Sequence, residues 1–367
     1  MNVPYEFIVA VPGLTSTPPI EAEETLFVGR NDPRYKAIIA REKPVETFLR
    51  RFNSPLGKRL SPVIIARRVA SRRLSTSALT GFRNAIAVQS VLKQRIAAWH
   101  GTPGSDVTFV DPFDIYPAGP GRGHYLQYST PMARGLDKIH ALRGQPGLGV
   151  FHPDWNVVDQ DDELLAALMC VWKWRARHIA DVSFRERVMR SLEMAYLGLR
   201  APMIQMTSRN DLGIALTAWV AAFETLAHPG DEKVGFKHVS TLIKEVKWHS
   251  SNLRRPRFVS GSGHPGKTTK PVQVYGRLWV ERSHALHGAP IPRKESRHRR
   301  TVFRELLLFQ APCLYRSVLL HVLSRCGHGT FPAKDLSRTI RIAPRLQEAY
   351  EAPLVGSRAR SKLAFLL

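Results

Sequence analysis

The chain has 367 residues, with 54 Lys and Arg against 30 Asp and Glu, so its formal net charge is +24. This excess favours polyanionic partners, nucleic acid above all. An anionic membrane surface is disfavoured because no basic segment has a clean opposing apolar face. The N-terminus lacks a basic segment followed by an apolar core, and we find no run of the ~20 apolar residues that a membrane span needs. We therefore expect a cytoplasmic protein with no membrane partner.

Three cysteines, Cys170, Cys313 and Cys326, are widely spaced and odd in number, which argues for a reducing compartment. Each is interpreted as a small buried apolar residue. Cys326 and His328 flank Gly327, but a zinc site needs a second such pair. We find no Asp, Glu and His cluster that would hold a metal, and we expect neither a metal nor a cofactor.

The positive charge is concentrated in two stretches of sequence. Residues 51–100 hold ten Lys and Arg and no Asp or Glu, while residues 251–300 hold twelve against two. Such clusters are typical of surfaces that contact a nucleic acid backbone. The predicted RNA-contacting residues are Arg67, Arg68, Arg72, Arg73, Arg254, Arg255 and Arg257.

The N-terminal part alternates short strands with one long helix. Apolar runs predict strands at Glu6–Val11, Thr25–Val28 and Val107–Val110, and apolar residues near period 3.6 predict a helix from Ser77 to about Trp99. Residues 111–149 are rich in Pro and Gly, which favours ordered loops. We expect residues 1–205 to form a mixed α/β region of unknown role.

Helical patterns dominate from Asp161 onward. The acidic residues Asp159, Asp161, Asp162 and Glu163 open the first helix; they could be paired catalytic carboxylates, but acidic side chains at a helix start complement its dipole. Further helices are predicted at about 183–200, 210–228, 235–248, 271–287 and 301–325. The fold class is therefore α+β, with a helical domain at 206–330 and a helical, basic tail at 331–367.

One segment, 261–268, fits the phosphate-binding pattern G-x-x-x-x-G-K-[ST] through Gly261, Gly266, Lys267 and Thr268. That loop requires a buried strand before it and a helix starting at the Lys-Thr pair. The preceding residues are mostly basic, and Pro271 falls where the first turns of the helix should run. A flexible basic linker is the favoured interpretation, and a nucleotide-dependent enzyme is the competing one.

A motif of the form Arg-Ser-x-x-x-His-Gly closes the helix predicted at 271–287. Arg282 supplies a permanent cation for a crowded phosphate, and His287 supplies a group that exchanges protons near neutral pH. Spacing alone does not identify a site, since Arg95 and His100, and Arg316 and His321, are separated by the same interval. The context differs: an apolar helix face precedes Arg282, Ser283 follows it, and Gly288 ends the helix.

These segments resemble the HEPN superfamily and, more narrowly, the Apea-like HEPN proteins of bacteria. The resemblance covers about residues 206–330. It rests on Phe223-Glu224-Thr225-Leu226 in one helix and on Tyr275 followed by Arg282-Ser-x-x-x-His287-Gly in another. Tyr275 lies farther from Arg282 than in many members. A register starting at Arg277 would use His284, six residues on and without the glycine.

The resemblance implies a metal-independent endoribonuclease of a bacterial defence or toxin type, often dimeric, with RNA as its substrate and a cognate inhibitor or defence partner. His287 would act as general base or acid, Arg282 would stabilise charge on phosphorus, Ser283 would orient one of them, and Glu224 would position either. Five residues of helix turn about 500°, so Arg282 and His287 point roughly 140° apart, and two copies could complete one site. The alternative is a catalytically silent HEPN module that binds RNA or a partner protein.

Overall fold

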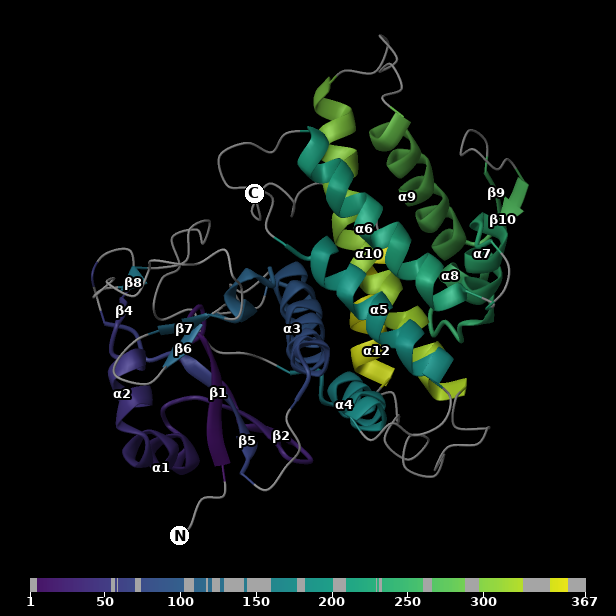
Figure 1. The fold of residues 1–367 in the computed structure, drawn as a ribbon. Coiled ribbons are helices and arrows are strands. Elements are labelled where there is room, and N and C mark those ends of the chain that lie inside the picture. The colour runs from purple at the N-terminus through teal and green to yellow at the C-terminus, as the bar shows by residue number, and fades with distance from the viewer. Residues whose placement is uncertain are drawn as a thin grey trace. The chain divides into compact units, whose positions relative to one another are not determined.

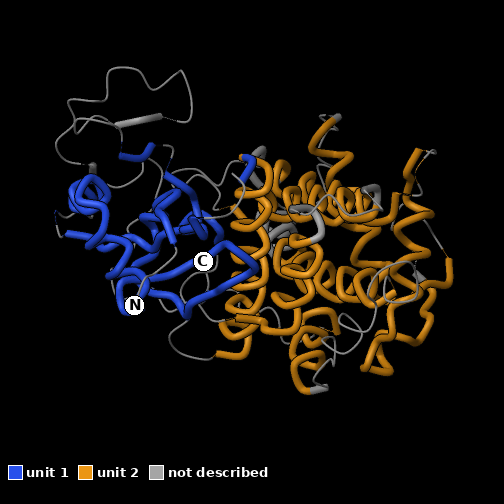
Figure 2. The backbone as a smooth tube through the Cα atoms, turned by 60° about the horizontal axis from the view of Figure 1, so that its bottom comes forward, with its two compact units in different colours: residues 1–75, 104–159 blue, residues 76–103, 160–367 orange. Residues whose placement is uncertain are grey.

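A computed structural model describes residues 5–53, 57, 59–69, 74–101, 109–116, 118–120, 126–128, 142–143, 160–176, 182–200, 209–228, 230, 233–259, 266–287, 297–325 and 344–355 (Figure 1). The chain divides into two compact units (Figure 2). Unit 1 comprises residues 1–75 and 104–159, and unit 2 comprises residues 76–103 and 160–367. The domain boundary expected at residue 205 falls inside unit 2.

Unit 1 contains a four-stranded antiparallel sheet in the order β1-β5-β3-β2. Its strands are β1 (Tyr5–Val11), β2 (Ile20–Ala22), β3 (Thr25–Val28) and β5 (Val63–Arg68). β1 and β3 confirm two predicted strands, whereas β2 and β5 were not predicted. Of the strand expected at 107–110, residues 107 and 108 lie outside the described residues, and residues 109 and 110 form a bend.

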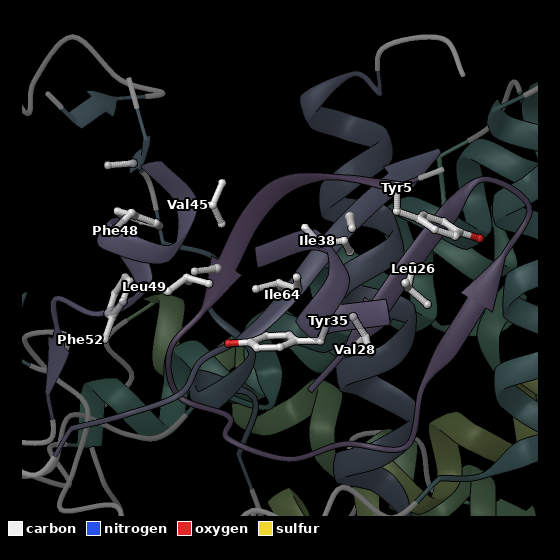
Figure 3. Close-up of a cluster of buried hydrophobic side chains, with 13 residues drawn as sticks. Tyr5, Leu26, Val28, Tyr35, Ile38, Val45, Phe48, Leu49, Phe52 and Ile64 are labelled. Carbon is white, nitrogen blue, oxygen red and sulfur yellow. The ribbon is translucent and has the colours of Figure 1, made fainter. Parts of the chain in front are cut away.

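Two short helices supply the other side chains of the unit 1 core. α1 (Pro33–Arg41) starts at Asp32, whose carboxylate accepts a hydrogen bond from the Arg34 amide at 2.8 Å, and α2 (Lys43–Leu49) follows. The Phe52 ring meets Phe48 edge-on at 5.3 Å between ring centres and Tyr116 at 4.9 Å. Figure 3 shows this cluster, in which helix and strand side chains are buried together.

Several short elements complete unit 1. They are β4 (Phe52–Asn53), a 3-10 turn at Asp111–Phe113, β6 (Ala118–Pro120), β7 (Leu126–Tyr128) and β8 (Leu142–Arg143). β4 pairs with β8 in parallel, and β6 pairs with β7 antiparallel. The 111–149 stretch, expected to be loops, therefore includes short paired segments.

In the described part of unit 2, helices dominate, with one two-stranded hairpin among them. The elements are α3 (Thr76–Trp99), α4 (Asp162–Ala176), α5 (Val182–Gly198), α6 (Arg209–Ala227), α7 (Phe236–Glu245), α8 (Ser251–Arg254), β9 (Arg257–Val259), β10 (Gly266–Thr268), α9 (Lys270–His287), α10 (Arg297–Arg325) and α12 (Pro344–Val355). The predicted helices are confirmed within a few residues at most ends. The α+β class is likewise confirmed.

α6 packs against α5, α7, α9 and α10. It buries Leu216, Trp219 and Phe223, and a helix with apolar residues on several sides belongs in the interior of a bundle. The Ser191 hydroxyl of α5 donates to the Ala222 carbonyl of α6 at 2.8 Å and lies 2.8 Å from the Tyr315 hydroxyl of α10. Hydrogen bonding thus links three helices within this core.

A buried ion pair joins α10 to the start of α4. The Arg316 Nε donates to Asp161 Oδ2 at 2.6 Å, and both side chains are fully buried. The other Asp161 oxygen accepts from the Leu164 amide at 3.2 Å, so this carboxylate also caps α4. Asp162 and Glu163 lie in the first turn, where acidic residues complement the helix dipole.

α10 contains a segment, Leu306–Arg325, that is long and apolar enough to cross a membrane by length and composition alone. The sequence-based expectation concerned an unbroken run of ~20 apolar residues, and Gln310, Arg316 and His321 interrupt this segment. In the structure 72% of its apolar window is buried inside the protein. Its apolar side chains are accounted for by packing within unit 2, as in the central helix of a bundle.

Candidate active site

α6 and α9 run antiparallel and approach closely at one end. A Cβ on Gly213 would lie only 2.7 Å from the Ala285 Cβ, so glycine is required for this approach. Near the other end, the rings of Phe223 and Tyr275 meet edge-on at 5.4 Å between centres. The two helices that carry the HEPN-like motifs are therefore neighbours along most of their length.

Glu224, next to Phe223 on α6, and Arg282, near Ala285 on α9, extend toward each other along the helix pair. Side chains on a helix tilt toward its N-terminus, so in an antiparallel pair the two residues reach toward the same level. The Arg282 Nη1 lies 4.0 Å from Glu224 Oε1, which is beyond hydrogen-bonding distance. The side chains are 31% and 22% exposed, so both remain accessible from solvent.

Tyr275 adds a buried hydroxyl near Glu224 and Arg282, whose charges act on its pKa. Its side chain is fully buried, and its hydroxyl has no hydrogen-bond partner within the described part of the chain. The buried Arg282 Nε likewise has none there. Unsatisfied buried donors carry a free-energy cost, so these two buried atoms mark hydrogen-bonding capacity that a buried water could satisfy.

Burial and charge alter the acidity of this cluster. Burial raises the pKa of Glu224, and the positive charge of Arg282 opposes that shift. Burial also raises the pKa of the Tyr275 hydroxyl, to which the negative charge of Glu224 adds. A carboxyl group shifted in this direction can hold or transfer a proton closer to neutral pH than an exposed one.

The other two arginines with the same spacing to a histidine are held differently. Arg95 is buried, its Nη1 donates to the Leu308 carbonyl at 3.2 Å, and burial lowers its pKa to about 10. Arg316 is fully buried against Asp161. Among these three arginines, Arg282 alone keeps a partly exposed guanidinium without a hydrogen-bonded carboxylate.

His287 is the last residue of α9, and its side chain lies outside the described residues. Ser283 is half-buried in the same helix. In the other register, Arg277 is half-buried, which lowers its pKa, and His284 lies with its Nδ1 3.8 Å from the buried Glu281 carboxylate. The two candidate histidines therefore sit within one turn of each other.

The arginines predicted to contact RNA have unlike surroundings in the two basic stretches. In β5, Arg67 forms an ion pair with Glu6, and Arg68 lies 3.6 Å from Glu21. Arg72 and Arg73 lie outside the described residues.

The second basic stretch is more open. Arg254, Arg255 and Arg257 are exposed, and no ion pair of theirs occurs within the described part of the chain. Their charges are therefore more available to a polyanion than those of Arg67 and Arg68.

The last three residues of the segment with the phosphate-loop spelling form β10, and residues 261–265 lie outside the described residues. Gly266, Lys267 and Thr268 pair with Val259, Phe258 and Arg257 of β9, so the Gly-Lys-Thr end of the pattern is a strand and does not start a helix. α9 begins only at Lys270, with Pro271 in its first turn. These positions support the rejection of a phosphate loop. Residues 266–268 form a paired strand, whereas the sequence predicted a flexible linker.

No group of three or more metal-binding side chains occurs among the described residues. Cys170 is half-buried and Cys313 buried, and both are free thiols, while Cys326 and His328 lie outside the described residues. Burial raises the pKa of the Cys313 thiol to about 12, which disfavours a reactive thiolate.

Comparison of the chain with protein-family models, curated proteins and solved structures finds no match. These comparisons therefore neither support nor oppose the resemblance to HEPN proteins. The sequence analysis named Tyr275 as part of a helix face and of the motif, without a role for its hydroxyl, and it did not single out Gly213. A glycine and an alanine, 213 and 285, on two helices expected to pack would have been a usable signal for close approach.

Proposed function

We propose that the protein is a metal-independent endoribonuclease whose site is built on Arg282 and His287, with Glu224 and Ser283 as positioning residues. The observation that carries the proposal is Arg282, whose side chain is 31% exposed and whose Nη1 lies 4.0 Å from Glu224 Oε1, too far for a hydrogen bond. A fixed cation with free donors suits a pentacoordinate phosphorus.

In this mechanism His287 removes the proton from a ribose 2′-hydroxyl, and the 2′-oxygen attacks the adjacent phosphorus. The bond from phosphorus to the 5′-oxygen breaks, and that oxygen takes up a proton. The products are a 2′,3′-cyclic phosphate and a 5′-hydroxyl. Arg282 stabilises the charge that develops on the non-bridging oxygens, and Glu224 fixes the Arg282 rotamer across the α6–α9 contact.

A homodimer would let one copy's Arg282 act with the other copy's His287. Ile214 and Leu286, next in sequence to the close contact of Gly213 and Ala285, are 67% and 56% exposed. Leu286 directly precedes His287. An apolar pair at this end of α9 suits coverage by a second copy.

The dimer is tested with Ile214→Asp and Leu286→Asp, measured by light scattering after size exclusion. Both variants should shift the mass to that of a monomer and lower cleavage. Leu197→Asp, at an exposed apolar position of α5, is the matched control and should stay dimeric. A monomeric parent chain that cleaves RNA at full rate would reject the composite site.

Cleavage itself is tested with purified chain and a mixed RNA pool in EDTA. We expect 2′,3′-cyclic phosphate and 5′-hydroxyl ends, complete loss of cleavage in His287→Ala, and retained RNA affinity. His284→Ala discriminates the registers, because it should keep most activity if His287 is the proton-transfer group. A Mg²⁺ requirement, or 5′-phosphate ends, would sink the proposal.

A catalytically silent HEPN module that binds RNA or a partner protein is the second candidate. It is favoured by the position of Glu224, whose charge could simply neutralise Arg282 at a helix contact. Under this alternative the chain binds RNA, and no substrate pool is cut. For either function we propose a cytoplasmic bacterial defence or toxin protein, restrained by a cognate inhibitor or defence partner.

A further inference from the structure

The β9–β10 hairpin connects α8 to α9 (Figure 1). Phe258 stands opposite Lys267 in the antiparallel register, so the two side chains share one face of the hairpin. Phe258 is 79% exposed, and Lys267 is also exposed. Single exposed apolar residues are common, but this ring stands beside the Lys267 cation and follows three arginines in the sequence, Arg254, Arg255 and Arg257.

A second group of cations lies where the hairpin joins α9. Lys270 and Arg277 are seven residues apart, which is about 700° of helix, so they fall on one stripe of α9. Both side chains are half-buried. Arg257 stands opposite Thr268, on the hairpin face away from Phe258.

The charges of this group act on one another. Burial lowers the pKa of Lys270, and the positive charges of Arg277 and Arg257 lower it further. Like charges held together in partly buried positions repel, and a bound anion would relieve that repulsion. The arrangement thus favours an anionic ligand, and the nearby exposed ring favours one that carries a flat apolar group.

We propose that the hairpin and the first turns of α9 bind single-stranded RNA, with phosphates on Arg257, Lys270 and Arg277 and a base stacked on Phe258. Stacking on an aromatic ring beside a basic track is how proteins hold single strands with little sequence preference. The inference rests on the proposed function, because it makes RNA the ligand. Arg277 and Arg282 are about 7.5 Å apart along α9 and roughly 140° apart around it, so a strand held here reaches the cleavage site only by passing around the helix.

A membrane surface fits these residues less well. Interfacial binding by a basic segment needs a continuous apolar face, and Phe258 is the only exposed large apolar residue that the described structure places on this hairpin. RNA offers both groups that the surface is suited to contact, a phosphate chain and flat bases.

The test uses the full-length His287→Ala chain, which binds without cutting, and a labelled single-stranded 12-nucleotide RNA followed by fluorescence anisotropy. Phe258→Ala should weaken binding by about fivefold to 100-fold with an unchanged salt slope. Lys270→Gln with Arg277→Gln should reduce the slope of log affinity against log salt by about 1.4. Phe258→Trp keeps a stackable ring and should rescue the alanine variant's loss.

Lys244→Gln, at an exposed cation of α7, is the matched control and should bind like the parent. Circular dichroism checks the fold of every variant. Parent-like RNA affinity in both Phe258→Ala and the Lys270, Arg277 double variant would overturn the inference. Binding to phosphatidylserine vesicles is measured alongside. Variants that lose binding to these vesicles but bind RNA like the parent would also overturn the inference. If RNA binds through this surface and is never cut, the nuclease proposal is rejected and the inference stands. If the chain cleaves RNA in EDTA and its RNA affinity does not depend on Phe258, the nuclease proposal stands and the inference is rejected.

Discussion

Arg282 in α9 and Arg316 in α10 each precede a histidine by five residues, but their surroundings are opposite. Arg316 is fully buried, with its Nε 2.6 Å from a fully buried Asp161 carboxylate, and its guanidinium stacks over the Tyr350 ring at 3.9 Å. Arg282 is 31% exposed, and its nearest carboxylate is at 4.0 Å. Arg316 is held by structural contacts, whereas the partly exposed Arg282 side chain has no hydrogen-bonded carboxylate.

A spacing motif acquires chemical meaning only from the burial and the partners of its side chains. A guanidinium that is dehydrated and already bonded to a carboxylate has little to offer a phosphate. A guanidinium at the edge of a helix pair, near a carboxyl group but not bonded to it, can reorient toward a substrate. The comparison can be tested at both arginines.

The largest effect on stability is expected at the buried pair. Arg316→Met leaves the Asp161 charge buried without its partner, so it should lower the free energy of unfolding by about 3–5 kcal/mol. Adding Asp161→Asn removes that charge but keeps a helix-capping side chain, and it should recover a large part of the loss. Urea unfolding followed by tryptophan fluorescence gives both values. A single variant within about 1 kcal/mol of the parent would mean that the pair is not structural.

Arg282→Gln should have the opposite profile. We expect cleavage to fall by about 10²–10³-fold, as for removal of one donor to a developing oxyanion. The partly exposed contact with Glu224 should contribute only about 0–1 kcal/mol to stability. Cleavage rates and urea unfolding of the same preparation check the two halves. A large stability loss with unchanged cleavage would reverse the comparison between the two arginines.

Gly213→Ala tests the helix contact that holds the Arg282 site. The new methyl would lie 2.7 Å from the Ala285 Cβ, so overpacking should cost about 1–3 kcal/mol and shift α6 from α9, lowering cleavage. Gly276→Ala in α9 is the matched control. Its Cβ would lie 3.5 Å from the Phe236 ring, an ordinary contact, and helix propensity favours alanine by up to about 1 kcal/mol. Equal effects at the two glycines would contradict close packing at Gly213.

The smallest effect is expected in the pH dependence of stability. The pKa of Glu224 is raised in the folded chain, so the folded state binds its proton more tightly than the unfolded state. Stability therefore decreases as the pH rises above the unfolded value, and Glu224→Gln should gain on the parent over that range. Unfolding at a series of pH values, with the exposed Glu193→Gln as control, measures the difference. Parallel curves for parent and Glu224→Gln would show that burial does not control this carboxyl.

Elements whose apolar residues follow a local period were predictable from the sequence. The helix at 76–99 and the helices that carry Glu224 and Arg282 could be predicted because each repeats apolar residues along its own length. The rejection of a phosphate loop at 261–268 was also local, because Pro271 and the basic residues before it are incompatible with the required strand and helix. The exposed arginines around residue 255 follow from composition alone.

The contacts between side chains on distant segments depend on the packing of the helices and strands, which no local pattern reveals. Glu224 and Arg282 are 58 positions apart in the sequence. Their helices approach closely because Gly213 has no Cβ to clash with Ala285. Arg67 was predicted to face a polyanion, but cross-strand pairing places it against Glu6. Burial is set by packing between distant segments. Packing therefore buries Arg316 against Asp161 and leaves Arg282 partly exposed, although both arginines precede a histidine by five residues.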